Sequence, residues 1–198
     1  AQWLLESGVK PEETLKLRPI AKADPMIPTV SDDNVPPEHH HITWHGDRAR
    51  EFIREGESPW FLLVNTFEPH PPFNPPWEYY RRQNPDSLPG AHFLETDIGT
   101  QRRLEESGVD FQTTADESDD AIARARIAAY YATIEMIDHE LGLLINTLED
   151  TGELANTIVL FSSDHGEMLG DHGLVLKGCR FYEGLIRVPL IWFGHHEI

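Results

Sequence analysis

The stretch NTIVLFSSDHGEMLGDHG, residues 156–173, decides how this chain is expected to fold. It begins with a short β-branched apolar run at 156–163 and becomes polar at Asp164. The length and composition of that run favour a buried strand over a helix. In parallel α/β sheets, ligands bind just beyond the carboxyl ends of the strands. The stretch therefore predicts a strand that ends in a loop able to bind a ligand.

A long helix is expected directly before this strand, over residues 119–151. Ser118 or Asp119 can cap its start, and Gly152 can end it. Apolar residues recur within it at the three-to-four spacing of one helix face, namely Ile127, Tyr130, Ile134, Ile137, Leu141, Leu144 and Leu148. This is the clearest helix signal in the chain.

Two further apolar runs are predicted to be strands. PWFLLVNTF, residues 59–67, precedes the long helix, and RVPLIWFG, residues 187–194, follows the polar loop. The first run is continuously apolar, which is typical of a strand buried on both faces. Strand, helix and strand in this order form a βαβ unit. The expected fold class is therefore α/β, with a mostly parallel sheet between helices.

The other segments are expected to be less regular, within a single domain that includes all of residues 1–198. Residues 1–45 are predicted to be rich in loops, and 46–67 to hold a short helix at 46–56 followed by the first strand. Residues 84–118 are polar and acidic and are interpreted as a surface insertion. Residues 119–194 would then form helix, strand, ligand-binding loop and strand.

Composition excludes several classes of function. The 198 residues carry a net charge of −18, which opposes binding to nucleic acid. No apolar run is long enough to span a membrane. The single cysteine excludes an internal disulfide. Such an acidic protein needs a local cation if it is to handle an anionic substrate, and a bound metal would supply one.

Asp164 and His165 are the first candidates for chemistry. A carboxylate and an imidazole side by side at a strand end can reach one cation, and Gly166 lets the backbone turn away. This donor pair suits Ca²⁺, Mg²⁺, Mn²⁺ or Zn²⁺. The competing interpretation is that Asp164 caps the next turn while His165 is simply solvated. From the residues alone, the two interpretations stand about even.

A second Asp-His-Gly follows at 171–173. Asp171 and His172 could bind the same metal, bind a second metal or shape the loop, and a role in supporting the loop is preferred. A Ser-His-Asp triad from Ser162 or Ser163 is disfavoured, because the chain lacks a G-x-S-x-G elbow. Neighbouring residues at a strand end also point to opposite faces.

Lys177 and Cys179 lie just beyond the loop. Lys177 is a candidate counter-charge for a phosphate or sulfate group and could protonate a leaving oxygen. The alternative is an ordinary surface lysine. Cys179 could be a thiolate nucleophile, but no neighbour suggests activation, so we expect a structural thiol.

Histidines cluster at two other places. His70 lies in FEPHPPF after the first predicted strand, where prolines would hold it in one orientation toward an anion. His39–His41 and His45 could bind a transition metal. In an acidic loop without cysteine they are interpreted as solvated, or at most as part of a substrate rim.

Several of these motifs together resemble the sulfatases of the alkaline phosphatase superfamily. SSDHGEMLGDHGL, LKG and FYEGLIRVPLI occur in the family's order, and PWFLLVNTFEPHPPFNPPWEYY resembles an earlier block of the same family. The resemblance covers roughly residues 42–194 and is specific, because several motifs agree in order. It implies an alkaline phosphatase-like α/β fold and hydrolysis of a sulfate ester with one bound divalent cation, usually Ca²⁺.

The resemblance also implies a role for individual residues. Asp164 and His165 match the two late metal ligands, although many family members have Asn at the second position. Lys177 matches the lysine that contacts the sulfate and the leaving oxygen. His70 matches the histidine that hydrogen-bonds the sulfate. The implied substrate is a small aryl or alkyl sulfate or a sulfated carbohydrate. Many members of the family that it resembles are exported to the periplasm, lysosome or exterior.

One departure from the family pattern is large. Sulfatases carry an early Cys-x-Pro-x-Arg or Ser-x-Pro-x-Arg motif, whose first residue becomes the formylglycine nucleophile, and an early pair of aspartates that completes the metal site. Neither motif is present, and Cys179 is followed by Arg-Phe-Tyr-Glu. We therefore expect an internal fragment that begins after the nucleophile and that is inactive and a weak cation binder alone.

Two other functions remain open at this point. A phosphonate or phosphate ester hydrolase of the same superfamily would use the same histidine, lysine and metal, because both esters are tetrahedral anions. A non-catalytic sulfatase-like domain that binds sulfated glycans belongs to a different class. Oligomeric state does not follow from the sequence.

Overall fold

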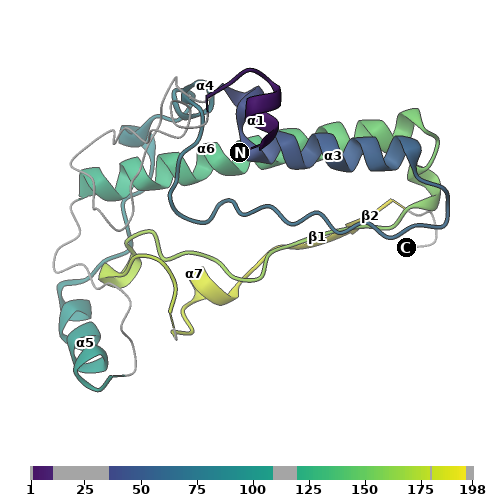
Figure 1. The fold of residues 1–198 in the computed structure, drawn as a ribbon. Coiled ribbons are helices and arrows are strands. Elements are labelled where there is room, and N and C mark those ends of the chain that lie inside the picture. The colour runs from purple at the N-terminus through teal and green to yellow at the C-terminus, as the bar shows by residue number, and fades with distance from the viewer. Residues whose placement is uncertain (1, 11–35, 109–119, 179, 195–198) are drawn as a thin grey trace. The chain divides into compact units, whose positions relative to one another are not determined.

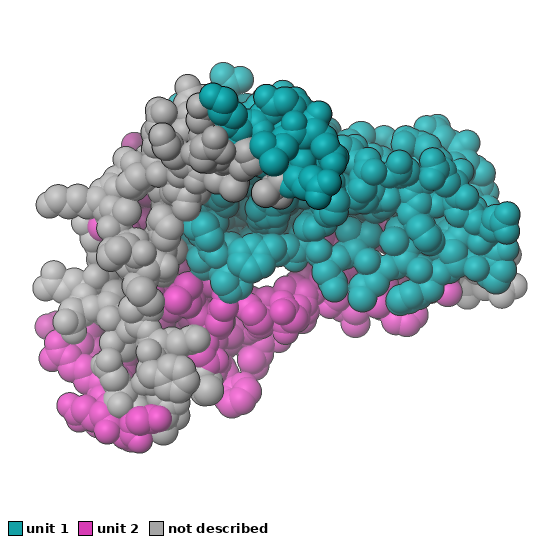
Figure 2. All heavy atoms as spheres, viewed as in Figure 1, with its two compact units in different colours: residues 1–84, 128–157 teal, residues 85–127, 158–198 magenta. Residues whose placement is uncertain are grey.

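The computed structural model describes residues 2–10, 36–108, 120–178 and 180–194 (Figure 1). The chain divides into two compact units, which Figure 2 shows in different colours. Unit 1 comprises residues 1–84 and 128–157, and unit 2 comprises residues 85–127 and 158–198. Each unit is described separately below.

Helices dominate unit 1. Its helical elements are α1 (Gln2–Glu6), the 3-10 turn η1 (Pro37–His39), α3 (His41–Glu55), the single turn α4 (Trp77–Tyr80), the larger part of α6 (Asp120–Asp150) and η3 (Leu154–Asn156). The predicted helix at 46–56 is therefore present, but it begins five residues earlier, at His41. His40 provides the missing start signal, since its Nδ1 accepts a hydrogen bond from the Ile42 amide at 3.3 Å.

The long helix α6 confirms the prediction of a helix at 119–151 to within one residue at each end. In unit 1 it lies beside α3 (Figure 1), and a buried ion pair of 2.5 Å joins Arg50 Nη1 on α3 to Glu140 Oε2 on α6. A Cβ at Gly46 would lie 2.1 Å from that same Glu140 oxygen. A side chain at position 46 would therefore displace the Glu140 carboxylate from its present position beside Arg50.

The first predicted strand, at 59–67, is not a strand in this structure. Residues 60–66 are assigned no regular secondary structure. Phe61 is 85% exposed and Leu63 is 68% exposed, so the expected burial on both faces is wrong for the described chain. A strand exists only through hydrogen bonds to a neighbouring strand, and none of the described residues pairs with this run.

Unit 2 holds the two strands described. Its elements are η2 (Pro85–Ser87), α5 (Glu95–Glu106), β1 (Val159–Ser162), η4 (Asp171–Gly173), α7 (Glu183–Ile186) and β2 (Leu190–Phe193), together with the first turns of α6. The predicted strands at 156–163 and 187–194 are present in shorter form. They pair with each other antiparallel, from Val159 opposite Phe193 to Ser162 opposite Leu190. The parallel pairing expected for this sheet is not seen between these two strands.

The predicted surface insertion at 84–118 contains more regular structure than expected. Its described part includes α5, and residues 109–118 lie outside the described residues. Two acidic residues stand in the first turn of α5, where they interact favourably with the helix dipole. The α5 segment contacts η4, and so belongs to the packing around the second Asp-His-Gly.

A small apolar cluster lies under the loop between β1 and β2. Met168, Leu174 and Leu185 are buried together, with Tyr182 packed against them. Backbone hydrogen bonds tie the loop to itself, including Gly166 N to Leu185 O at 2.8 Å and Met168 N to Leu176 O at 3.0 Å. The loop after β1 is therefore a folded part of unit 2.

None of the helices among the described residues is both long enough and apolar enough to cross a membrane.

Candidate active site

Asp164 and His165 lie just past the end of β1, as predicted. Both side chains are exposed, at 87% for Asp164 and 41% for His165. The Asp164 carboxylate accepts a hydrogen bond from the His165 amide at 2.9 Å. This bond and the charge of His165 outweigh the opposing effect of burial, so the pKa of Asp164 falls below its usual value. Asp164 therefore stays ionised at neutral pH.

The geometry of this pair suits a shared cation. His165 Nε2 and Asp164 Oδ2 are 3.8 Å apart. Two ligands of one cation, each bonded at about 2.0–2.6 Å, lie at about this separation. His165 Nδ1 is 2.8 Å from the Gly166 carbonyl oxygen, so a proton on Nδ1 donates to that oxygen. This tautomer leaves the Nε2 lone pair available to a metal.

Gly166 fixes the direction of the chain beyond this pair. A Cβ at position 166 would lie 1.9 Å from the backbone oxygen of Gly184. Gly166 N also donates to Leu185 O at 2.8 Å. The backbone can leave the site this close to α7 only because residue 166 has no side chain.

Lys177 lies close enough to the same loop to interact with its acidic groups. Burial lowers the pKa of Lys177, and the carboxylates of Glu167 and Asp164 partly oppose that shift. Its Nζ is buried and makes no hydrogen bond to any of the described residues. A buried ammonium without a hydrogen-bond partner is costly, and an anionic ligand would satisfy it. Glu167 is the nearby acid that sequence reasoning missed.

Glu167 faces the opposite shift. Burial raises its pKa, and the charge of Lys177 together with backbone hydrogen bonds offsets part of the rise. Glu167 precedes buried Met168 within the loop, and its own amide donates to Gly184 O at 3.1 Å. The sequence did contain a signal that could have identified Glu167, because it is an acidic residue in a glycine-rich loop directly after a predicted strand.

The second Asp-His-Gly is built into the packing of unit 2. The Asp171 carboxylate accepts from the His92 amide at 2.6 Å. The His172 ring stacks on Tyr182 at 4.3 Å between centroids, and its Nδ1 is 3.4 Å from an oxygen of Asp97. His172 itself has a positive φ of 57°. These contacts support the preferred interpretation, in which the pair shapes the loop.

The two serines at the end of β1 are engaged with the backbone. Ser162 Oγ donates to Pro189 O at 3.0 Å, and Ser163 Oγ donates to His165 O at 2.8 Å. Neither hydroxyl is hydrogen-bonded to an imidazole in these contacts, which agrees with rejecting a serine triad. Cys179 lies outside the described residues.

His70 belongs to unit 1, whereas the other three predicted site residues belong to unit 2. It is exposed, and its Nδ1 lies 2.7 Å from the Pro71 carbonyl oxygen. Its ring packs against Phe67 at 4.6 Å between centroids. The structure thus brings Asp164, His165 and Lys177 together in unit 2. His70 lies in unit 1, and its contacts are described within that unit alone.

A second group of titratable side chains lies in unit 1, at the start of α3. His40 is 2% exposed and Glu68 is 5% exposed, while His41 is half-buried. His41 Nε2 lies in hydrogen-bond contact with Glu68 Oε1. The interpretation of this histidine run as solvated is wrong for His40. His40 is the N-cap residue of α3, which begins at His41, and it is buried.

Burial perturbs all three groups strongly. It lowers the pKa of His40 to about 3, with a further contribution from His41. It lowers the pKa of His41 to about 4, with a further contribution from His45. It raises the pKa of Glu68 to about 7. Sequence reasoning did not single out Glu68, although an acidic residue between an apolar run and a proline-rich loop was a usable signal.

Comparison with known proteins places these features in a family. A family model described as Sulfatase matches residues 28–198. An arylsulfatase of Clostridium perfringens is 35% identical over 152 residues, which cover 76% of this chain and 31% of the relative. A choline-sulfatase of Rhizobium meliloti is 37% identical over 154 residues, which cover 74% of this chain and 28% of the relative. The chain thus spans about a third of the length of these relatives.

Solved structures agree on the fold. The crystal structure of a phosphonate monoester hydrolase of Agrobacterium radiobacter matches with a TM-score of 0.76 and 24% identity, over 96% of this chain and 40% of that chain. The chain therefore has part of the predicted alkaline phosphatase-like α/β fold, with a small sheet among its described residues. By its family match and its relatives, this chain belongs to the sulfatase family of the alkaline phosphatase superfamily.

Proposed function

We propose that this chain supplies the late metal-binding and sulfate-binding residues of a metal-dependent sulfuric ester hydrolase. The observation that carries the proposal is the group after β1, where one loop holds Asp164, His165 and Lys177, whose buried Nζ has no hydrogen-bond partner among the described residues. Membership of the sulfatase family supports the same reaction class. The proposed substrates are aryl or alkyl sulfates or sulfated carbohydrates.

Asp164 and His165 are proposed to hold one divalent cation. Their oxygen and imidazole donors suit Ca²⁺ first, with Mg²⁺, Mn²⁺ and Zn²⁺ as alternatives. When bound, the cation would offset the charge of the sulfate oxygens beside an acidic protein surface. The hydrogen bond from Nδ1 to the Gly166 carbonyl keeps Nε2 of His165 directed as a ligand.

Lys177 and His70 are proposed to act on the sulfate itself. Lys177 would pair with a sulfate oxygen and deliver a proton to the leaving oxygen, which its lowered pKa makes easier. His70 would hydrogen-bond the sulfate through Nε2, because its Nδ1 is directed to the Pro71 carbonyl. The nucleophile, a formylglycine, is proposed to lie outside this chain, so the chain alone should not turn over substrate.

The reaction class is tested with the intact protein. Initial rates are measured on matched aryl sulfate and aryl phosphonate esters, before and after chelation and again after Ca²⁺ is restored. We expect faster hydrolysis of the sulfate, loss of rate on chelation and recovery with Ca²⁺. A much faster phosphonate reaction would replace the sulfatase assignment. No turnover of either ester, with retained binding of sulfated glycans, would favour a non-catalytic role.

The role of Lys177 is tested separately. Lys177→Ala should lower kcat by about 10²-fold, as expected when one cation that contacts the transition state is removed. The control is Lys10→Ala, which replaces an exposed lysine near the start of the sequence and should leave kcat unchanged. A Lys177→Ala protein with normal kcat would remove this residue from the proposed site.

A phosphonate or phosphate ester hydrolase is the second candidate. The same donors can bind either tetrahedral anion, so the chemistry of the site does not separate them. The observation in its favour is that the fold of a phosphonate monoester hydrolase matches over 96% of the chain. The paired rate measurement decides between the two.

A further inference from the structure

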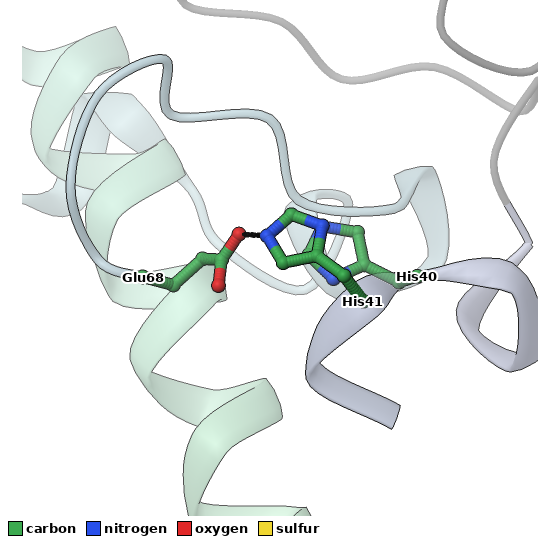
Figure 3. A group of neighbouring side chains, drawn as sticks. All are labelled: His40, His41 and Glu68. Atoms are coloured by element: carbon green, nitrogen blue, oxygen red, sulfur yellow. Dashed lines mark ion pairs between the residues drawn. The ribbon is translucent and has the colours of Figure 1, made fainter. Parts of the chain in front are cut away.

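Two adjacent histidines at the start of α3 interact with the two ends of the loop that carries His70. The loop runs from Glu68 to Asn74, and His70 lies two residues after its beginning. His41 Nε2 lies in hydrogen-bond contact with Glu68 Oε1, as Figure 3 shows. All of these residues belong to unit 1. The start of α3 and the loop are therefore joined inside one compact unit.

His40 interacts with the far end of this loop. Its Nδ1 accepts a hydrogen bond from the Ile42 amide, so the ring hydrogen of the neutral imidazole is on Nε2. Burial lowers the pKa of His40 to about 3, and the Asn74 backbone acts in the opposite direction. A backbone group that favours the protonated ring is an acceptor, namely the carbonyl. His40 Nε2 therefore faces the Asn74 carbonyl, although it makes no full hydrogen bond to the described residues.

The contact between His41 and Glu68 holds a single hydrogen. Burial lowers the pKa of His41 to about 4 and raises the pKa of Glu68 to about 7. At neutral pH the imidazole is neutral, so either its Nε2 hydrogen is donated to the carboxylate or a protonated Glu68 donates to Nε2. Both forms keep one hydrogen bond. The Glu68 side chain is only 2% exposed, so little water competes for it.

The position of His70 depends on where this loop is held. Its amide donates to Phe67 O at 3.1 Å, its Nδ1 is 2.7 Å from the Pro71 carbonyl oxygen, and its ring packs against Phe67. Both partners lie within three residues of His70 along the chain, so these contacts move with the loop. Prolines at positions 69, 71 and 72 restrict the backbone and make the segment stiff. A displacement at Glu68 is therefore carried to His70.

The loop is also attached to the second long helix of unit 1. Phe73 is buried, and its ring packs edge-on against Tyr130 of α6 at 5.6 Å between centroids. The buried ion pair between Arg50 and Glu140 joins α6 to α3. Removal of the Glu68 side chain should therefore shift the beginning of the loop without detaching the loop from unit 1.

Packing alone does not explain a carboxylate in this position. Glu68 Oε2 is buried and makes no hydrogen bond to the described residues. A buried polar atom without a partner costs about 1–3 kcal/mol, whereas an apolar side chain would avoid that cost. The carboxylate gives a directional contact with His41 instead, which fixes the angle of approach as well as the distance.

We propose that His41 and Glu68, assisted by His40, are positioning residues that hold His70 in the orientation needed to hydrogen-bond the sulfate. This role rests on the proposed function, because it requires that His70 contacts the substrate. The three positioning residues themselves touch neither the substrate nor the cation. A reacting group displaced by about 1 Å can lose about 10²-fold in rate, so a small shift of the loop is enough to matter.

The test is a double-mutant cycle in the intact protein, measured as kcat/KM on an aryl sulfate. His70→Ala and Glu68→Ala should each lower kcat/KM by about 10- to 10²-fold. In the His70→Ala background, adding Glu68→Ala should cause less than about a 2-fold further loss, because Glu68 acts through His70. His41→Ala should behave as Glu68→Ala does.

A conservative variant separates positioning from charge. Glu68→Gln keeps a side chain that can hydrogen-bond to His41 Nε2, so its kcat/KM should stay within about 3-fold of the parent value. His39→Ala is the matched control, because His39 belongs to the same histidine run and packs instead near Trp3, at 6.4 Å between rings. It should leave kcat/KM unchanged.

Circular dichroism of each variant shows whether it is folded. If Glu68→Ala does not fold, Glu68→Asp takes its place in the cycle, because it keeps the charge and withdraws the carboxylate by one methylene group. The same loss of kcat/KM is then expected from Glu68→Asp.

Three outcomes would overturn the positioning role. If His70→Ala slows the reaction but folded Glu68 and His41 variants do not, the proposed function stands and the positioning role is wrong. If the losses from His70→Ala and the Glu68 variant multiply, Glu68 acts by a separate effect on the structure. A His70→Ala protein with normal kcat/KM would remove His70 from the proposed site and the positioning role with it.

Discussion

The two Asp-His-Gly copies have the same sequence and opposite surroundings. Asp164 and His165 project outward after β1, and their hydrogen bonds are to each other and to nearby backbone. Asp171 and His172 instead contact His92, α5 and Tyr182. In the first copy, the carboxylate and imidazole remain accessible to a ligand. In the second copy, the same groups make contacts within unit 2.

This difference shows that neighbouring elements decide the role of a motif. A strand ends directly before the first copy, so its side chains leave the sheet edge freely. The second copy is itself the 3-10 turn η4, with Gly170 before it at a φ of 114°. Substituting matched positions in the two copies tests whether the division of roles holds.

The largest contrast is expected between the two aspartates in catalysis. In the intact protein, Asp164→Ala should lower kcat/KM by about 10³-fold and reduce bound metal, because it removes a proposed ligand. Asp171→Ala should retain its metal and most of its activity. Metal content and steady-state kinetics on an aryl sulfate measure both. An active, metal-replete Asp164→Ala protein would contradict the ligand assignment.

The second contrast is between the two glycines. Gly166→Ala should destabilise the protein by about 3 kcal/mol, because the new methyl would meet the Gly184 oxygen. Gly173→Ala should lower the free energy of unfolding by about 1 kcal/mol, because a residue with a side chain is strained at a φ of 73°. Urea unfolding of both variants gives the comparison. Equal losses would mean that the loop after β1 relaxes away from α7.

The third contrast concerns the histidines. His172→Ala should destabilise by about 2 kcal/mol, because it removes the stacking on Tyr182 and the partner of Asp97. His165→Ala should change stability by less than about 0.5 kcal/mol, since its side chain is largely solvated. Thermal unfolding of the metal-free proteins separates these effects from ligand binding. A larger loss for His165→Ala would reverse the proposed roles.

The smallest effect is expected at the second aspartate. Asp171→Ala removes the acceptor of the His92 amide, a bond at the surface where water can replace it. The expected loss is about 1 kcal/mol. Asp171→Asn keeps an acceptor oxygen and should lose less. Denaturant midpoints of the two variants measure this, and a loss well above that of His172→Ala would show a greater role for the carboxylate.

Local pattern predicted the elements that depend on local signals. The periodicity of α6 identified the helix, its cap signals placed both ends to within one residue, and the position of Asp164 beyond a β-branched run placed it correctly at a strand end. Glycine was also the right clue at 166, where a close backbone approach excludes a side chain.

Features that depend on distant partners could not be predicted in the same way. The run at 60–66 has a strand-like composition, but strand formation depends on neighbours that the run itself does not specify. The ladder between β1 and β2 is antiparallel, because the loop and α7 reverse the chain between them. Burial of His40 and its approach to Glu68 required the fold to join positions 28 residues apart.

The unpaired run at 60–66 also has a practical consequence for handling the protein. Its Phe61 and Leu63 are exposed, and the run has no partner strand among the described residues. Such a segment is a template for edge-to-edge association between molecules. A polypeptide limited to these 198 residues should therefore self-associate at high concentration, and a lysine at position 61 or 63 should keep it dispersed.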